Sequence, residues 1–122
     1  MEKEKVVEIQ DLDNKLKFRI RLFSPMAGIK FFDTFMASVD GKFSIEAMLK
    51  DLLPLATQLS SDGKAITDLT LEMADTLFQN PLAVMDLGIE IFQFQQVFME
   101  SSPRFRPFAS KVQNLLASTN LG

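Results

Sequence analysis

The chain has 122 residues, a net charge of −3 and 47% apolar residues, which together favour one folded domain over a disordered chain. It contains no cysteine and no histidine, which excludes disulfides, thiolate or imidazole metal sites and the common nucleophile–base pairs of enzymes. The 13 basic residues are spread along the chain in short clusters only, and this distribution argues against a nucleic-acid-binding surface.

The N-terminus is charged and has no apolar run behind it, so we expect no signal peptide. The most apolar stretch, Leu82–Met99, contains Asp86, Glu90 and three glutamines, all of which a membrane-spanning helix would have to bury. We therefore expect no membrane span and no membrane partner. With the usual catalytic residue types missing, we also expect no enzyme activity and no cofactor.

Two alternating runs near the N-terminus predict an antiparallel β-hairpin over residues 1–22. Val7 and Ile9 alternate with polar residues in the first run, and residues 11–14 are rich in turn formers. The second run has an apolar face of Leu16, Phe18, Ile20 and Leu22 and a basic face of Lys15, Lys17, Arg19 and Arg21. That basic stripe is either the solvated face of a strand or a surface that steers an acidic partner.

Helical signals follow from residue 24 to residue 59. Ser24 and Pro25 are typical of a helix start, and Asp40-Gly41 of a helix end. The expected inward residues of this first helix are Ile29, Phe32, Phe35, Met36 and Val39. Ser44 is expected to cap a second helix with Ile45, Met48, Leu49, Leu52, Leu55 and Leu59 inward. Pro54 should kink or divide that helix.

A loop is expected at residues 60–65, followed by further helices over residues 66–118. The first of these should start near Asp68 or Thr70, with Leu69, Met73, Leu77 and Phe78 inward. Asn80-Pro81 should open the next, which runs to about Ser101 and is apolar around most of its circumference. Ser102-Pro103 restarts the pattern with Phe105, Phe108, Val112 and Leu115, and residues 119–122 form a polar tail.

The predicted fold class is therefore mainly α (α+β). We expect residues 1–122 to form a single domain in which the hairpin is followed by about five helices in a compact bundle. Asp86 and Glu90 can share a helix face, but no other ligand-type residue accompanies them, so a solvated stripe is favoured over a metal or acid–base site.

The helix over residues 81–101 carries more apolar surface than a chain this small can easily cover, which predicts self-association or a protein partner. Twelve phenylalanines and seven methionines supply adaptable apolar contact area. The candidate partner-binding residues are Leu87, Ile91, Phe94, Phe98 and Phe105. Core packing is the competing interpretation of the same regular spacing.

The order of elements resembles the tail assembly chaperones of long-tailed bacteriophages with non-contractile tails. The likeness runs from the hairpin Val6–Leu22, through the helix Pro25–Val39, to the stretch Asn80–Phe98. The resemblance implies a non-catalytic protein that binds the tape measure protein in the cytoplasm of the bacterial host, with the tail tube protein as a further candidate partner. Two other interpretations stay open: a small structural or adaptor subunit of a finished assembly, and an apolar carrier lined by Phe and Met.

Overall fold

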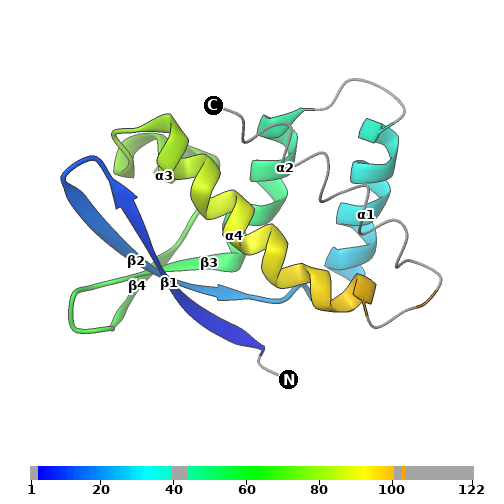
Figure 1. Ribbon diagram of the computed structural model, residues 1–122, viewed down its shortest axis with the longest axis horizontal. Helices are drawn as coiled ribbons and strands as arrows, with labels where there is room; N and C mark the ends of the chain where they lie inside the picture. The colour runs from blue at the N-terminus through cyan, green and yellow to red at the C-terminus, as the bar shows by residue number, and fades with distance from the viewer. Residues whose placement is uncertain (1–2, 40–43, 101–102, 104–122) are drawn as a thin grey trace.

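The computed structural model describes residues 3–39, 44–100 and 103, and within them the chain forms a four-stranded antiparallel sheet and four α-helices (Figure 1). The elements follow in the order β1 (Glu4–Asp11), β2 (Asn14–Arg21), α1 (Pro25–Val39), α2 (Ile45–Leu52), a 3-10 turn η1 (Leu53–Leu55), β3 (Ala56–Leu59), β4 (Ala65–Asp68), α3 (Leu71–Leu77) and α4 (Pro81–Glu100).

The predicted hairpin followed by a five-helix bundle is wrong, although the hairpin itself is present. Residues 56–59 and 65–68, expected to be mostly helical, form β3 and β4. Pro54 does divide the predicted second helix, but the part after it pairs with β2, with Lys17 opposite Leu59. A short apolar run fits either a helix or a strand by its periodicity, and here the open edge of β2 decides in favour of a strand.

The N-terminal hairpin has the predicted apolar and polar faces. Val7 lies opposite Phe18 and Ile9 opposite Leu16, and these side chains are buried or half-buried on the inner face. Leu12 occupies the first position of the two-residue loop with φ = 52°, a left-handed conformation that is strained for a residue with a branched side chain.

The expected loop at residues 60–65 is the turn between β3 and β4. The Ser60 hydroxyl donates a hydrogen bond to the Asp62 carboxylate, and the Lys64 backbone N–H donates to the same group at 3.3 Å. These two hydrogen bonds, the Ser60 bond foremost, lower the pKa of the Asp62 carboxyl below its ordinary value.

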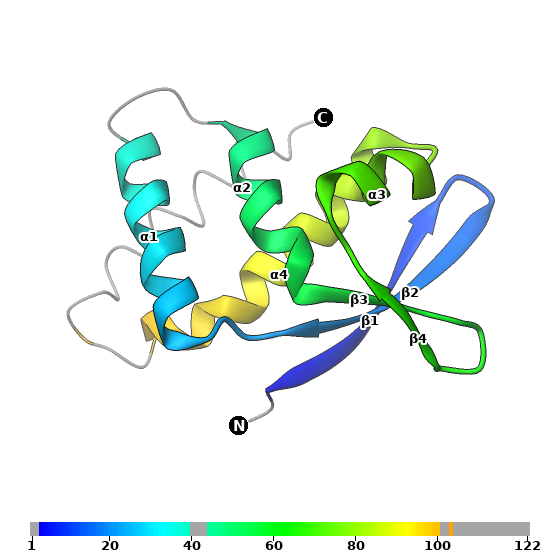
Figure 2. The same cartoon turned by 180° about the vertical axis from the view of Figure 1, so that it is seen from behind.

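In the described part of the chain, helices cover one face of the sheet and leave the other open. In the order β1-β2-β3-β4, β1 and β4 are the outer strands. Helix α4 crosses the sheet on one side, against β1 and β2, while the opposite side is seen from behind in Figure 2. Helices α1 and α2 stand side by side at one end.

Helix α1 has the predicted bounds but presents a different face to the core. Phe31 is buried together with Phe35, whereas Ile29, expected inward, is 61% exposed. Phe31 stacks on Phe23 at 5.0 Å between ring centroids and also contacts Phe92 of α4 at 5.9 Å. This aromatic cluster sets the rotation of the helix. Met36 and Val39 were also expected to face inward, but their side chains are not among those that the structure describes.

The predicted helix starts are confirmed. The Ser44 hydroxyl accepts a hydrogen bond from Ala47 N–H at 3.2 Å, and the Thr70 hydroxyl accepts one from Met73 N–H at 3.2 Å. Met73 was expected inward but is exposed, because α3 turns Ala74 to the core instead.

Helix α4 begins at Pro81 as predicted and contributes Leu87, Ile91 and Phe92 to the core. At Gly88 an added Cβ would lie 2.5 Å from Leu49 Cδ2, so this glycine allows α2 to pack closely. One cluster of buried side chains includes residues from β1 to β3 and from all four helices. The helix and tail predicted over residues 103–122, apart from residue 103, lie outside the described residues.

Candidate functional site

The structure separates the five residues predicted to bind a partner. Leu87 and Ile91 are 0% exposed and belong to the core, so they are not open to a partner in this conformation. Phe94 and Phe98 are half-buried and pack against the core with part of each ring accessible. Phe105 lies outside the described residues.

Phe98 lines an apolar cleft of ≈ 640 Å³ between the start of α1 and the end of α4, here called the α1–α4 cleft. Its lining residues are Lys3, Glu4, Arg21, Leu22, Phe23, Ser24, Pro25, Gly28, Ile29, Phe32 and Phe98. The charged residues come from the ends of β1 and β2, and apolar residues supply most of the rest. A depression of this size with an apolar lining is typical of a binding surface.

The buried side chain of Gln95 holds the wall of the cleft in place. Its Oε1 accepts a hydrogen bond from Phe23 N–H at 2.9 Å, and its Nε2 donates to Arg21 C=O at 2.8 Å and Ile91 C=O at 3.2 Å. The amide therefore ties the link between β2 and α1 to α4. Ser24 then begins α1, with its hydroxyl accepting from Ala27 N–H at 3.4 Å.

Two exposed apolar side chains stand at the start of α1. Met26 is 73% exposed, and Ile29, which lines the cleft, is 61% exposed. Ile29 was predicted to face inward and Met26 was not singled out, because α1 carries apolar residues on opposite faces and its periodicity alone does not say which face is buried. The signal available in the sequence was the spacing of Met26 and Ile29, one turn apart just after the helix start.

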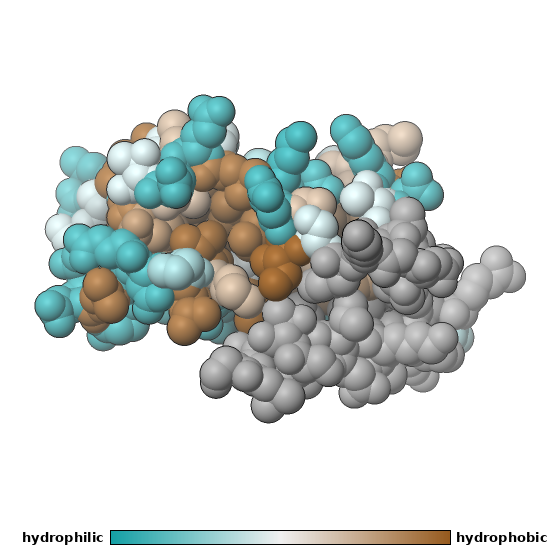
Figure 3. Space-filling view, turned by 90° about the horizontal axis from the view of Figure 1, so that it is seen from above, coloured by the Kyte–Doolittle hydropathy of each residue, from teal (hydrophilic) through white to brown (hydrophobic). Residues whose placement is uncertain are grey.

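A second apolar depression, of ≈ 620 Å³, lies between α2, α3 and α4. Its apolar lining includes Ile45, Leu49, Leu71, Val84 and Met85. In the view from above, apolar side chains gather on the left, where α2 and α3 lie, and polar side chains border them (Figure 3).

A smaller hollow of ≈ 380 Å³ separates Lys5 of β1 from the outer side of α4. Phe94 and Val97 lie along it, and the carboxylates of Glu90 and Glu100 also line it. Phe94 and Phe98, both predicted to bind a partner, thus line two different depressions.

The basic stripe of β2 lies on the open face of the sheet among acidic residues. Arg19 is paired with Glu4 at 4.0 Å, Lys15 with Glu8 at 3.7 Å, and Arg21 with Asp68 at 3.5 Å. These neighbours offset much of the stripe's charge, which favours the solvated-face interpretation over a surface that steers acidic partners.

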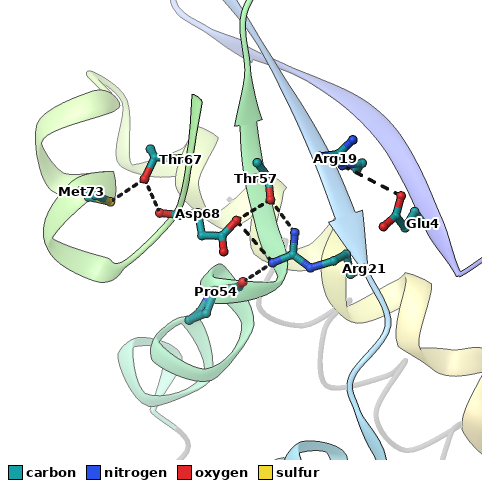
Figure 4. A network of polar contacts seen from close by, with 8 residues as sticks. All are labelled: Glu4, Arg19, Arg21, Pro54, Thr57, Thr67, Asp68 and Met73. Carbon is teal, nitrogen blue, oxygen red and sulfur yellow. Dashed lines mark hydrogen bonds and ion pairs between the residues drawn. The ribbon is translucent and has the colours of Figure 1, made fainter. Parts of the chain in front are cut away.

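Arg21 is the centre of a polar network that joins β2, β3 and β4 (Figure 4). Its guanidinium donates to the Thr57 hydroxyl and, at 2.9 Å, to Pro54 C=O. Thr57 in turn donates to Asp68 at 2.5 Å. Every acceptor of these hydrogen bonds belongs to the protein itself, so the network is suited to holding the strands of the sheet together.

The carboxylates Asp86 and Glu90 do not form part of a larger acidic cluster. Within residues 3–39, 44–100 and 103, no group of three carboxylates is arranged to hold a metal ion. Asp86 is exposed and Glu90 half-buried on α4. In the described part of the chain, no helix is long and apolar enough to cross a membrane.

No protein-family profile, no curated protein and no solved structure matches this chain.

Proposed function

We propose that this chain is a non-catalytic assembly factor that shields an apolar segment of a client protein. The observation that carries the proposal is the α1–α4 cleft of ≈ 640 Å³, which the exposed Ile29 lines; Met26, also exposed, lies one turn earlier on α1. Exposed apolar surface with a polar rim is typical of protein–protein contact sites.

The chemistry of the cleft fits the apolar face of a client helix. Phe32, Phe98 and Ile29 offer apolar contact area, and the neighbouring Met26 has a flexible side chain that adapts to irregular partners. Lys3, Glu4 and Arg21 at the ends of the strands carry both signs of charge, so they suit the polar flanks of an amphipathic helix.

The resemblance to siphophage tail assembly chaperones supports the tape measure protein as the client, with the tail tube protein as a second candidate. A long protein rich in apolar helix aggregates when it is left uncovered, and a small protein with an adaptable apolar cleft would prevent this. On this proposal the chain acts in the cytoplasm of the bacterial host and associates with itself when no client is bound.

The proposal is tested by co-expression with a tape measure protein, measuring how much of that protein stays soluble and co-purifies. Ile29→Asp places a charge beside the cleft and should weaken binding by about tenfold or more. Ile66→Asp is the matched control, because Ile66 is 57% exposed on β4 and does not line the cleft. Equal binding by both variants would contradict the proposal.

A structural or adaptor subunit is the second candidate, and the open outer strands of the sheet favour it because they can pair with other subunits. Analysis of finished particles separates the two functions. An assembly factor should be absent from particles, whereas a structural subunit should be present in fixed copy number. Native mass spectrometry tests the carrier interpretation, for which the cleft volume is also suitable.

A further inference from the structure

β1 lies at one edge of the sheet that the described residues form. Leu22 N–H donates to Lys3 C=O at 3.2 Å, and Lys3 and Leu22 continue the β1–β2 register. Because residues of an antiparallel strand alternate in the direction of their backbone groups, the odd-numbered residues of β1 bond to β2. The N–H and C=O groups of Glu4, Val6, Glu8 and Gln10 therefore point to the free edge. None of the described residues forms a strand on that side.

The hollow beside Lys5 and α4 lies where a strand added to this edge would place side chains. Lys5 and Val7 point to the same face of the sheet as Phe18 and Ile20, the face that α4 covers. Directly opposite residues in paired strands share a face, so partner residues opposite Lys5 and Val7 would point toward α4 as well. Phe94 and Val97 would then contact the aliphatic parts of the partner's side chains, and Glu90 would contact the polar ends of those side chains.

The charged residues around the edge of β1 indicate which kind of strand this edge can bind. Glu4 and Glu8 line the open face of β1 and remain more than half exposed despite their pairs with Arg19 and Lys15. Glu90 and Glu100 line the hollow on the α4 side, and among its described lining residues Lys5 is the one cation. A second copy of β1 would bring its own Glu4 and Glu8 against this edge, which like-charge repulsion disfavours.

We propose that the open edge of β1 and the hollow beside Phe94 and Val97 bind an extended, basic segment of a partner protein as a fifth strand. Backbone hydrogen bonds to Val6 and Glu8 would supply binding that tolerates different sequences. Lys or Arg side chains at alternate positions would lay their aliphatic stems on Phe94 and Val97 and direct their charges to Glu90. This site differs from the α1–α4 cleft, with which it shares Glu4 at the start of β1, and the proposal does not depend on the function proposed for the cleft.

The test uses the full chain and two short fluorescein-labelled peptides, one alternating Arg and Val and one alternating Glu and Val. Fluorescence anisotropy should show that the Arg–Val peptide binds about tenfold or more tightly than the Glu–Val peptide. In hydrogen exchange, the peptide should protect the amides of Val6 and Glu8, while those of Val7 and Ile9, already bonded to β2, should change little. Equal affinities would overturn the proposal, as would protection that misses Val6 and Glu8.

Two variants test whether the peptide binds at the edge of β1 and beside Glu90. Val6→Pro removes an N–H that β2 does not use, so it should abolish peptide binding with the hairpin intact. Glu90→Lys should weaken binding of the Arg–Val peptide about tenfold, whereas Asp86→Lys, the same charge change one turn earlier on α4, should alter it less than about twofold.

Unchanged binding by Glu90→Lys would overturn the proposal even if Val6→Pro failed to fold. Protection of Val6 and Glu8 that rises with protein concentration and needs no peptide would overturn it in favour of self-pairing. Ile29→Asp should leave peptide binding unchanged, so failure at this edge is distinguishable from failure at the cleft.

Discussion

Two buried polar side chains join parts of the chain that are far apart in sequence. Asp11, at the end of β1, accepts hydrogen bonds from Gln79 N–H and Asn80 N–H, both at 2.9 Å, and so fixes the hairpin tip to the start of α4. Gln95 plays the corresponding role at the other end of α4, on the link between β2 and α1. Buried polar groups are costly unless they are paired, so these contacts specify one arrangement of helix and sheet.

Replacing Gln95 tests how much its buried hydrogen bonds contribute to stability. Gln95→Leu should lower the free energy of unfolding by about 3 kcal/mol, because it leaves Phe23 N–H and Arg21 C=O without their partner and each such group costs roughly 1–3 kcal/mol. Gln93→Leu, at an exposed position of the same helix, should change it by less than about 0.5 kcal/mol. Urea unfolding measures both, and equal stabilities would show that the Gln95 contacts contribute little.

At the scale of elements, the sheet is held by side chains as well as by its backbone ladder. Strands β3 and β4 have four residues each, and their ladder has a register shift between Gln58 and Leu59. Such short strands gain little from their own pairing. The Arg21 network compensates, because one guanidinium reaches η1, β3 and β4 together.

Arg21→Lys should therefore destabilise the protein by about 1 kcal/mol, since an ammonium group cannot reproduce the forked contacts of a guanidinium. The matched control is Arg19→Lys, which makes the same change on the same strand and face, where the side chain is ion-paired to Glu4 at 4.0 Å. That exposed pair should contribute less than about 0.5 kcal/mol. Thermal or urea unfolding measures both variants, and an equal effect of the two would rule out a special role for the Arg21 network.

At the scale of the whole molecule, the surface combines an open charged sheet face with two apolar depressions among the helices. The exposed side chains of Met26, Ile29 and Leu82 add to the apolar area. Surfaces of this kind are covered by partners or by further copies of the same chain.

We expect the isolated protein to self-associate. Sedimentation equilibrium should give a mass that rises above the 13.8 kDa of the monomer as the concentration increases. Ile29→Asp should reduce the association because it adds a charge beside the α1–α4 cleft, whereas Ile66→Asp should not. A mass that stays at the monomer value at all concentrations would contradict this expectation.

Part of the candidate site was predictable from the sequence. Phe94 and Phe98 were singled out by their spacing, and both line depressions of the surface. Leu87 and Ile91 shared that spacing but are core residues, because the sheet, η1 and α2 pack against α4. The exposure of Met26 and Ile29 was not predicted, because only the packing of Phe23 on Phe31 shows which face of α1 is exposed.

The sequence by itself determined the features that depend on neighbouring residues. The alternation of residues 15–22 specifies the hairpin, and Ser24, Ser44 and Thr70 mark helix starts whose caps close within three residues. Tertiary structure alone decided that residues 56–59 and 65–68 are strands. The backbone groups of β3 are satisfied by pairing with β2, about forty residues earlier in the chain, and β4 pairs in turn with β3. No local sequence pattern shows whether so distant a strand edge is open.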